Sequence, residues 1–265
     1  MISATTGYVP SLLAGRAALI TGGGTGICRG IALAMASLGC DVAISSRNQE
    51  HLQETALEIT GLGVRSLAVT GDVRRPDDVA AVVGRTVETF GRLDILVNGA
   101  AGNFLCLAEQ LSPNGFGSVV DIDLKGTFNV SRAAFPYLAR QGGVILNISA
   151  TLQLLGTRAQ VHASAAKAGV DALTRGLAVE WGPSRIRVNG LAPGPVDGTE
   201  GVRRLITAAT RAAIIGACPL GQLAGVDDVA RAAVFLCSDL GSFITGVTLV
   251  VDGGLWLNSA RALGE

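Results

Sequence analysis

A glycine-rich turn between two apolar segments constrains this chain more than any other stretch of it. Residues 16–35 read RAALITGGGTGICRGIALAM, which is an apolar strand, a turn rich in glycine and an amphipathic helix in immediate succession. Glycine lets a chain reverse tightly and bring backbone N–H groups close to a ligand, and the amino end of the following helix favours negative charge. The stretch predicts a site for the pyrophosphate of a dinucleotide, although such turns also occur as plain connectors.

Strand-like and helix-like segments alternate from Arg16 to about Asp252, and no low-complexity segment interrupts them. We expect strands at 17–21, 41–45, 64–70, 93–98, 143–149, 187–192 and 247–251, and helices at 26–38, 52–62, 76–90, 121–140, 162–181 and 226–237. This alternation predicts one α/β domain over residues 1–265, with a core of about 14–256 and a polar, helical excursion on the substrate side at 196–222. The expected fold is a Rossmann-type, doubly wound, seven-stranded parallel sheet with helices on both faces.

Composition and charge argue against several classes of function. The 21 acidic and 21 basic side chains balance, so no overall field draws the chain to nucleic acid or to an anionic membrane. The five cysteines show no C-x-x-C spacing and the two histidines are far apart, so we expect neither a metal site nor a disulfide framework. No apolar run reaches the roughly 18 residues that a membrane span needs, and the amino end does not have the pattern of a secretion signal.

The ends of the second, third and fourth expected strands suit different parts of a dinucleotide. An acidic residue after the second strand would bind a free ribose 2'-hydroxyl, whereas a basic one would bind a 2'-phosphate. Ser46 and Arg47 stand there, which favours NADPH; the alternative is that Arg47 merely ends a strand in solvent. Asp72 and Val73 follow the third strand, where the carboxylate could hold the adenine amino group. Small residues at 99–102 would let a flat ring approach the backbone after the fourth strand.

Over residues 16–254 the chain resembles the short-chain dehydrogenase/reductase family. The resemblance is carried by Thr21–Ile27, Asp72–Val73, Asn98–Ala101, Lys167, Asn189, Pro193–Gly194 and Asp252–Gly254. Within the family, the phrases AAGNFL, DIDLKGTFNVSRA, VHASAAKAGVDALTR and LAPGPVDGTEGVRRL are similar to peroxisomal-type 2,4-dienoyl-CoA reductases. The cofactor contacts are thus expected at Gly22, Gly23, Gly24, Thr25, Gly26, Ile27, Ser46, Arg47, Asp72, Val73, Asn98, Ala100, Lys167, Pro193, Gly194 and Val196. The resemblance places substrate contacts at Arg47, Arg74, Phe104, Ser112 and Asn114.

Two departures from the family pattern bear on the reaction. Most members have a tyrosine four residues before the active-site lysine and a serine thirteen residues earlier still, and these positions are Ala163 and Ala150 here. A methyl group can neither donate a proton nor hydrogen-bond an oxyanion, so ordinary ketone or alcohol chemistry is disfavoured. A conjugated thioester needs no tyrosine, because its charge spreads into a dienolate. The resemblance implies reduction of 2,4-dienoyl-CoA by NADPH in unsaturated fatty acid β-oxidation, with hydride added at C5, a proton at C2 and 3-enoyl-CoA as product.

Lys167, Asp123 and Asp171 are the expected catalytic residues. Lys167 would bind the nicotinamide ribose and lend positive charge near the thioester oxygen, since the alanines around it leave its ammonium little other company. Asp171 lies four residues later on the same helix face, and Asp123 occupies the position that faces the lysine in the family's site. The two carboxylates would orient a proton-donating water. The alternatives are a surface ion pair for Asp171, a helix cap for Asp123 and a structural rather than substrate-binding role for His162.

Two other functions stay open at this stage, and so does the compartment. One is a trans-2-enoyl-CoA reductase, which adds hydride at C3; the other is a catalytically inactive NADP-binding regulatory protein. The partner is expected to be an acyl-CoA thioester, with a homo-oligomer, either a tetramer or a dimer, implied by family habit. The cytoplasm and, by resemblance, the peroxisome are both possible, although residues 262–265 are not a Ser-Lys-Leu type of address.

Cys28 stands where the family pattern has its third glycine, at the start of the first helix. That glycine allows close packing of helix on sheet. We expect the small thiol to shift the helix slightly rather than to block the pyrophosphate.

Overall fold

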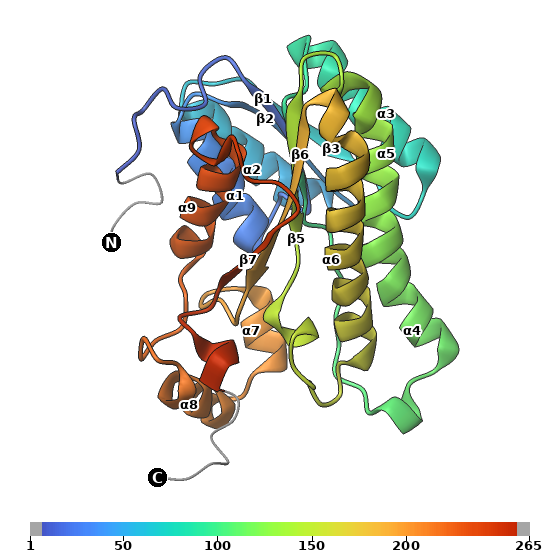
Figure 1. Ribbon diagram of the computed structural model, residues 1–265, viewed down its shortest axis with the longest axis vertical. Helices are drawn as coiled ribbons and strands as arrows, with labels where there is room; N and C mark the ends of the chain where they lie inside the picture. Colours follow the sequence, from blue (N-terminus) through green and yellow to red (C-terminus); the bar gives the residue numbers. More distant parts are fainter. Residues whose placement is uncertain (1–6, 259–265) are drawn as a thin grey trace.

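Seven parallel strands form one sheet in the computed structural model, which describes residues 7–258 (Figure 1). The strands are β1 (Ala17–Thr21), β2 (Asp41–Ser46), β3 (Ser66–Thr70), β4 (Ile95–Asn98), β5 (Gly143–Ile148), β6 (Ile186–Pro193) and β7 (Thr248–Val251). Their spatial order is β3-β2-β1-β4-β5-β6-β7, and every pairing is parallel. The predicted doubly wound sheet is confirmed. Its order reverses between β1 and β4, which is where such sheets bind ligands at the carboxyl ends of their strands.

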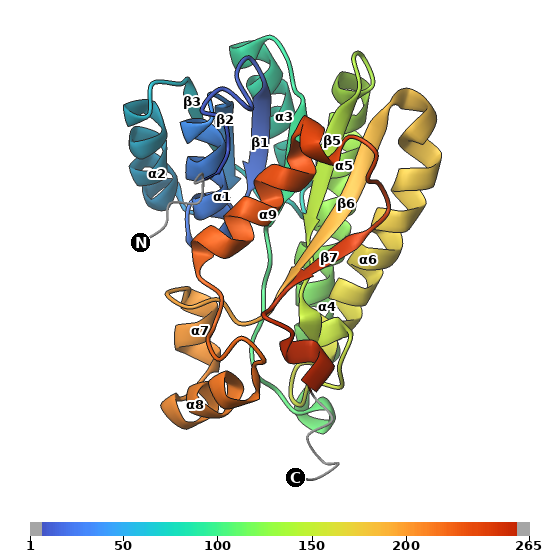
Figure 2. The same ribbon diagram turned by 60° about the vertical axis from the view of Figure 1, so that its left-hand side comes forward.

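Helices cover both faces of the sheet (Figures 1 and 2). They are α1 (Gly26–Ser37), α2 (Gln49–Gly61), α3 (Pro76–Phe90), α4 (Pro113–Val120), α5 (Gly126–Leu138), α6 (Val161–Trp181), α7 (Glu200–Leu205), α8 (Ala208–Ala217) and α9 (Val226–Cys237). Successive strand residues point to opposite faces. Ala18 and Ile20 of β1 therefore pack with α1, α2 and α9, whereas Ala17 and Leu19 pack with α3, α5 and α6. None of the helices within residues 7–258 has the length and apolar character needed to cross a membrane.

The helix expected at 121–140 begins eight residues earlier than the sequence pattern indicated. Ser112 caps α4 by accepting a hydrogen bond from the Gly115 amide at 3.0 Å, and Pro113 occupies the first turn. A π-helical stretch, η2 (Asp121–Lys125), then joins α4 to α5 without a break. Such wide turns are rare and often occur at functional sites.

The excursion after β6 contains two short helices. Thr199 and Thr207 cap α7 and α8 by accepting hydrogen bonds from Val202 and Thr210 amides, at 3.4 and 3.2 Å. Both helices lie beyond the carboxyl ends of the strands, below α9 in Figure 2. The predicted helical excursion therefore borders the edge of the sheet where a ligand is expected.

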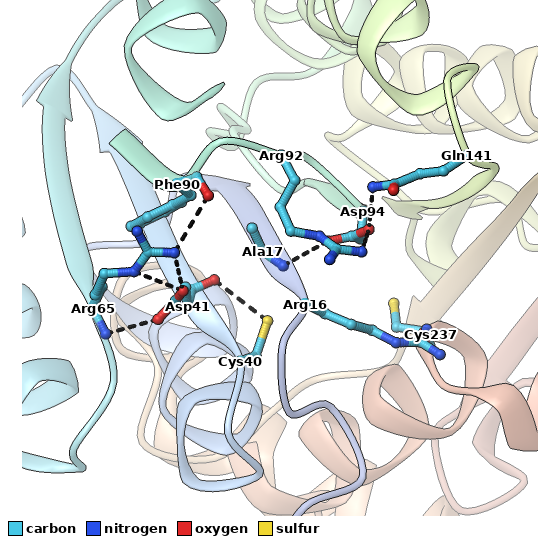
Figure 3. Close-up of polar contacts among 10 residues, drawn as sticks. All are labelled: Arg16, Ala17, Cys40, Asp41, Arg65, Phe90, Arg92, Asp94, Gln141 and Cys237. Carbon is cyan, nitrogen blue, oxygen red and sulfur yellow. Dashed lines mark hydrogen bonds and ion pairs between the residues drawn. The ribbon is translucent and has the colours of Figure 1, made fainter. Parts of the chain in front are cut away.

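Two carboxylates hold the opposite, amino edge of the sheet together (Figure 3). Asp94 accepts hydrogen bonds from the first amide of β1 at 2.8 Å, from two guanidinium nitrogens of Arg92 at 2.7 Å each, and from Gln141 at 2.9 Å. Asp41 accepts from the amide and the guanidinium of Arg65. The fold itself supplies the partners of these charged groups. This edge therefore stabilises the sheet and does not resemble a ligand site.

Candidate active site

The glycine turn after β1 presents backbone N–H groups at the carboxyl edge of the sheet. Gly22 has φ = 71°, and a Cβ there would lie 2.7 Å from the Gly99 carbonyl oxygen, so only glycine fits. Gly26, with φ = 57°, starts α1. Thr25 precedes it as the capping residue, yet its side chain makes no cap hydrogen bond, and the first turn has no acidic side chain. The amino end of α1 is therefore available to an anion, as a pyrophosphate requires.

The remaining turn residues pack tightly on their surroundings. A Cβ on Gly23 would lie 2.6 Å from the side chain of Ile44, and the Gly24 carbonyl accepts a hydrogen bond from Thr55 at 3.1 Å. Ile27 lies half-buried in the first turn of α1. These contacts hold the turn rigidly between β2 and α2.

The Cys28 thiol fills space that Gly99 leaves free. A Cβ on Gly99 would lie 2.0 Å from Cys28 Sγ. Burial raises the pKa of the Cys28 thiol to about 12, although the positive charge of Lys167 acts in the opposite direction. The thiol is therefore neutral at physiological pH and joins α1 to the turn after β4 as a small apolar group.

Among the residues expected to contact the adenosine, Arg47 is free of hydrogen bonds within the described part of the chain, whereas Asp72 is bound to a neighbouring arginine. Arg47 is exposed and has no hydrogen-bond or ion-pair partner among residues 7–258, while the Ser46 hydroxyl donates to the Asn48 carbonyl at 3.2 Å. The hydrogen bonds from Arg74 lower the pKa of Asp72 to about 2, and Arg74 Nε lies 2.9 and 3.0 Å from the two carboxylate oxygens. Asp72 and Arg74, expected to contact adenine and substrate, therefore bind each other here.

Val73 and Asn98 have side chains that serve the fold. Val73 lies against Gly126, where a Cβ would approach its side chain to 2.5 Å. Asn98 donates from Nδ2 to Ser131 and to Asn147, each at 2.9 Å, inside the molecule. Any cofactor contact by Val73 would therefore come from its backbone, whereas Asn98 Oδ1 has no hydrogen-bond partner among the described residues.

The turn that follows Asn98 is held over the end of β1. The Thr21 hydroxyl accepts from the amides of Gly99 and Ala100 at 3.0 and 3.3 Å. At the end of β6, the Gly194 amide donates to Val251 at 3.1 Å. These bonds hold two of the expected cofactor-binding turns at the carboxyl edge.

Close packing also defines the turn after Pro193, the last residue of β6. A Cβ on Gly194 would lie 2.7 Å from that of Asp252. Val196 is buried and forms an isolated parallel bridge with Ala224. The excursion thus leaves the sheet edge from a fixed starting point.

Lys167 has two protein partners. Its Nζ donates to the Ile148 carbonyl at 2.8 Å and lies 3.1 Å from Oδ2 of Asp123. The expectation that its ammonium would have little company except a cofactor is therefore wrong, because the partners come from β5 and from η2. Asp123 is 1% exposed, and its Oδ1 accepts from the Gly102 amide at 2.7 Å. The alternative of a helix cap at Asp123 is also wrong, because the helix starts at Pro113.

Asp171 is buried one turn after Lys167 rather than paired with it at the surface. Its exposed fraction is 5%, and Oδ2 accepts from Gln153 Nε2 at 2.5 Å. The surface ion-pair alternative is therefore wrong. Gln153 had no signal in the sequence, because it ends a short 3-10 helix (Thr151–Gln153) that has no regular pattern along the chain.

Two alanines stand where the family's hydroxyls would be. Ala163 is buried on α6, four residues before Lys167, and Ala150 follows β5. The nearby Ser164 hydroxyl donates to the Leu152 carbonyl at 3.2 Å. It therefore serves the local fold instead of replacing the missing tyrosine.

Of the substrate contacts implied by resemblance, Phe104 packs on a residue of α6. Its ring packs on the imidazole of buried His162, with 4.4 Å between centroids. Ser112 and Asn114 lie exposed at the start of α4, where the Ser112 hydroxyl serves as the helix cap. The structure therefore joins Phe104 to α6 and leaves the other two at the outer end of α4.

Buried polar atoms without a hydrogen-bond partner are concentrated in the elements that carry Lys167 and its partners. Within residues 7–258 they are Asn98 Oδ1, Asn103 Oδ1, Asp123 Oδ2, Ser149 Oγ, both ring nitrogens of His162 and Asp171 Oδ1. All belong to β4, β5, η2 and α6 or to the loops that join them. Buried polar groups are nearly always hydrogen-bonded, so this concentration indicates a place where ligand or water completes the bonding.

Comparisons with known proteins show which family this chain resembles. The family model described as "Enoyl-(Acyl carrier protein) reductase" matches residues 22–256. The chain is 49% identical over 257 residues to a Danio rerio protein named "Peroxisomal 2,4-dienoyl-CoA reductase [(3E)-enoyl-CoA-producing]", covering 96% of this chain and 86% of that one.

A second relative and a solved structure extend the comparison. A Bacillus subtilis (strain 168) protein named "Probable 2,4-dienoyl-CoA reductase [(2E)-enoyl-CoA-producing]" is 43% identical, with 92% of this chain and 97% of that one covered. The crystal structure of a short chain dehydrogenase from Bacillus anthracis str. 'Ames Ancestor' superposes with a TM-score of 0.82 at 40% identity, covering 91% of this chain and 96% of that one.

The contact between Gly99 and Cys28 predicts paired effects of substitution. Gly99→Ala should weaken binding of the nicotinamide dinucleotide about tenfold or more, because the new methyl group would overlap the thiol and displace the turn. Adding Cys28→Gly should restore much of the affinity, and Cys28→Gly alone should bind the dinucleotide as tightly as the parent or more tightly. Fluorescence titration measures all three. Equal weakening in the single and double variants would refute the steric explanation.

Proposed function

We propose that this chain, which belongs to the short-chain dehydrogenase/reductase family, is a 2,4-dienoyl-CoA reductase that uses NADPH. One observation carries the proposal. Lys167 is buried in an ion pair with Asp123, while the positions of both family hydroxyls are alanine. Reduction of a ketone forms an alkoxide that needs a proton donor, and this site has none at the family's positions. It suits a conjugated thioester instead, because the negative charge formed by hydride addition spreads into a dienolate.

The residues around the glycine turn fit a nicotinamide dinucleotide. The uncapped amino end of α1 would hold the pyrophosphate, and Gly22 leaves room for the backbone to approach it. When bound, the reduced nicotinamide supplies the hydride. An ammonium has three N–H groups. Lys167 uses one on Ile148 and one on Asp123, so the third is available for a ribose hydroxyl.

Lys167 would also favour the charge that develops on the thioester. A positive charge in a water-poor site stabilises a dienolate more strongly than it would in water. Asp123 lies on η2 and Asp171 lies one turn after Lys167 on α6. Asp123 Oδ2 has Lys167 as its ion-pair partner, and Asp171 Oδ1 has no hydrogen-bond partner among the described residues. These oxygens would orient the water that protonates carbon.

Arg47 supports the choice of NADPH over NADH. It follows β2, where the adenosine ribose binds in this fold, and it is exposed with no hydrogen bond or ion pair among residues 7–258, although its charge helps to lower the pKa of Asp72. A guanidinium suits a phosphate because its donors are planar and permanently charged. Because the side chain is exposed, its guanidinium could donate hydrogen bonds to a 2'-phosphate at the protein surface.

The names of two relatives differ in the position of the product's double bond. The Danio rerio relative is named for a (3E)-enoyl product and the Bacillus subtilis relative for a (2E)-enoyl product. We propose the 3-enoyl product, with hydride at C5 and a proton at C2, because the missing tyrosine removes the donor that would sit beside the hydride. The 2-enoyl-CoA reductase and the inactive regulatory protein are the alternatives that the assay below tests.

Assembly and location are part of the same proposal. A homo-oligomer is proposed from family habit, and a peroxisomal location from the names of relatives. Residues 262–265, where an address was sought in the sequence, lie outside the described residues.

The direct test follows NADPH oxidation with 2,4-hexadienoyl-CoA and, separately, crotonyl-CoA, with the product's double bond located by NMR. We expect turnover of the dienoyl thioester and a 3-enoyl product. Turnover of crotonyl-CoA alone would identify a 2-enoyl-CoA reductase. Failure to turn over either thioester, with NADPH binding intact, would contradict both reductase functions.

The roles of the carboxylates are tested by Asp123→Asn and Asp171→Asn. We expect kcat to fall by roughly 10²-fold in each, with NADPH affinity little changed, because a positioned proton source contributes about that much. Asp239→Asn is the matched control, since this carboxylate is 80% exposed at the other edge of the sheet. Unchanged kcat in both site variants would refute the role of the carboxylates in protonation.

Arg47→Ala should remove most of the preference for NADPH over NADH. A lost charge-assisted hydrogen bond to phosphate corresponds to about a tenfold or greater change in the ratio of kcat/KM values. Arg85→Ala, which removes an exposed arginine from the middle of α3, serves as the control. Equal use of both cofactors by the parent chain would overturn the assignment.

A further inference from the structure

His162 is a fully buried imidazole that the fold leaves unsatisfied. It is the second residue of α6, its exposed fraction is 0%, and neither ring nitrogen has a hydrogen-bond partner among residues 7–258. Any protonation state of imidazole carries at least one N–H donor. Leaving such a group buried and unpaired destabilises the folded state. A core position for packing alone would be better served by an apolar ring of similar size.

Three contacts join the loop after β4 to the start of α6, where this imidazole lies. Phe104 packs on it with an interplanar angle of 32°, Asn103 Nδ2 donates to Gln160 Oε1 at 2.6 Å, and the Cys106 amide donates to the Ala159 carbonyl at 2.9 Å. Ala159 has φ = 62°, a left-handed conformation that is unfavourable outside glycine. These contacts fix the loop after β4 against the start of α6, so the ring is held in place.

The amino end of α6 also favours negative charge next to this ring. The helix runs for 21 residues, its capping residue Gln160 makes no side-chain cap bond, and the first turn contains no acidic side chain. The unpaired amides of such an end carry partial positive charge. The imidazole belongs to the first turn of this helix, and Phe104, which the family resemblance assigns to substrate binding, packs on it.

In a dienoyl thioester the carbonyl oxygen lies far from the carbon that receives hydride. A hydrogen-bond donor to that oxygen would therefore stand elsewhere than the family's tyrosine. In a ketone, the carbon that receives hydride is bonded directly to the oxygen, and the family's tyrosine, here Ala163, reaches that oxygen. In a 2,4-dienoyl thioester, C5 receives the hydride, and four carbon–carbon bonds separate it from the carbonyl carbon. The oxygen that gains charge therefore lies farther along the substrate. His162 precedes Ala163 at the outer end of α6.

We propose that His162 donates a hydrogen bond to the thioester carbonyl oxygen of the bound substrate, beside the ring of Phe104. This proposal rests on the proposed function. The substrate gains hydride at C5 and a proton at C2, and His162 keeps its own proton throughout. Its part is to polarise the conjugated system and to stabilise the dienolate oxygen, which the alanines at the family's hydroxyl positions cannot do.

The test compares His162→Phe, which keeps an aromatic ring against Phe104 but removes both nitrogens, with His162→Gln, which keeps a donor. The first readout needs no turnover: the absorbance of 2,4-hexadienoyl-CoA bound with NADP+. A hydrogen bond to the carbonyl polarises the diene and shifts its band to longer wavelength. We expect the shift in the parent chain, its loss in His162→Phe and its partial retention in His162→Gln.

The second readout is kinetic. Removal of one oxyanion donor typically lowers kcat by 10² to 10³-fold, so we expect a fall of about 10²-fold in His162→Phe and a smaller one in His162→Gln. NADPH affinity and thermal melting should change little in either variant. If His162→Phe does not fold, the band shift of the parent and its partial retention in His162→Gln still decide the question.

Several results would overturn this role of His162. They are an unshifted band in the parent chain, a full shift together with parental kcat in His162→Phe, and complete loss of the shift in a folded, substrate-binding His162→Gln. Failure of the proposed function looks different, because the parent chain itself would then turn over neither thioester.

Discussion

The buried ion pair of Lys167 and Asp123 is the interaction on which the site depends. Removing two charges from water costs several kcal/mol for each ion, and their attraction offsets this only when further hydrogen bonds complete the geometry. The Ile148 carbonyl and the Gly102 amide provide those bonds. The end of β5, the loop after β4, the π-helical stretch η2 and helix α6 must therefore meet at one point. Displacement of any of them would leave a buried charge without its partners.

The two edges of the sheet use polar groups in opposite ways. At the amino edge, Asp94 and Asp41 receive hydrogen bonds from groups that the fold itself provides (Figure 3). At the carboxyl edge, buried oxygens and ring nitrogens around Lys167 lack partners among the described residues. An unsatisfied buried group destabilises the folded state. Keeping several of them in one place is consistent with a surface shaped for a polar ligand and for water.

Much of the fold could be predicted because its signals are local and periodic. The helix at 76–90 begins with a proline in its first turn and ends at Gly91 in a left-handed conformation, and its bounds agree with the prediction. The helix at 113 was missed because Gly115 and Gly117 resemble a loop, although Ser112 and Pro113 form a normal start signal. Tertiary packing overrides such weak propensities, and a π-helical stretch such as η2 leaves no regular pattern in a sequence.

The sequence by itself determined the parallel sheet, the glycine turn, the presence of Arg47 after the second strand and the loss of both family hydroxyls, since these depend on residue type and spacing. Only the tertiary structure decided which groups meet. Lys167 bonds to a backbone carbonyl, Asp171 to Gln153, and the Cys28 thiol fills the space beside Gly99. Every residue has a carbonyl, and any small side chain can border a glycine. Such partners are therefore selected by the packing of distant segments and not by a pattern along the chain.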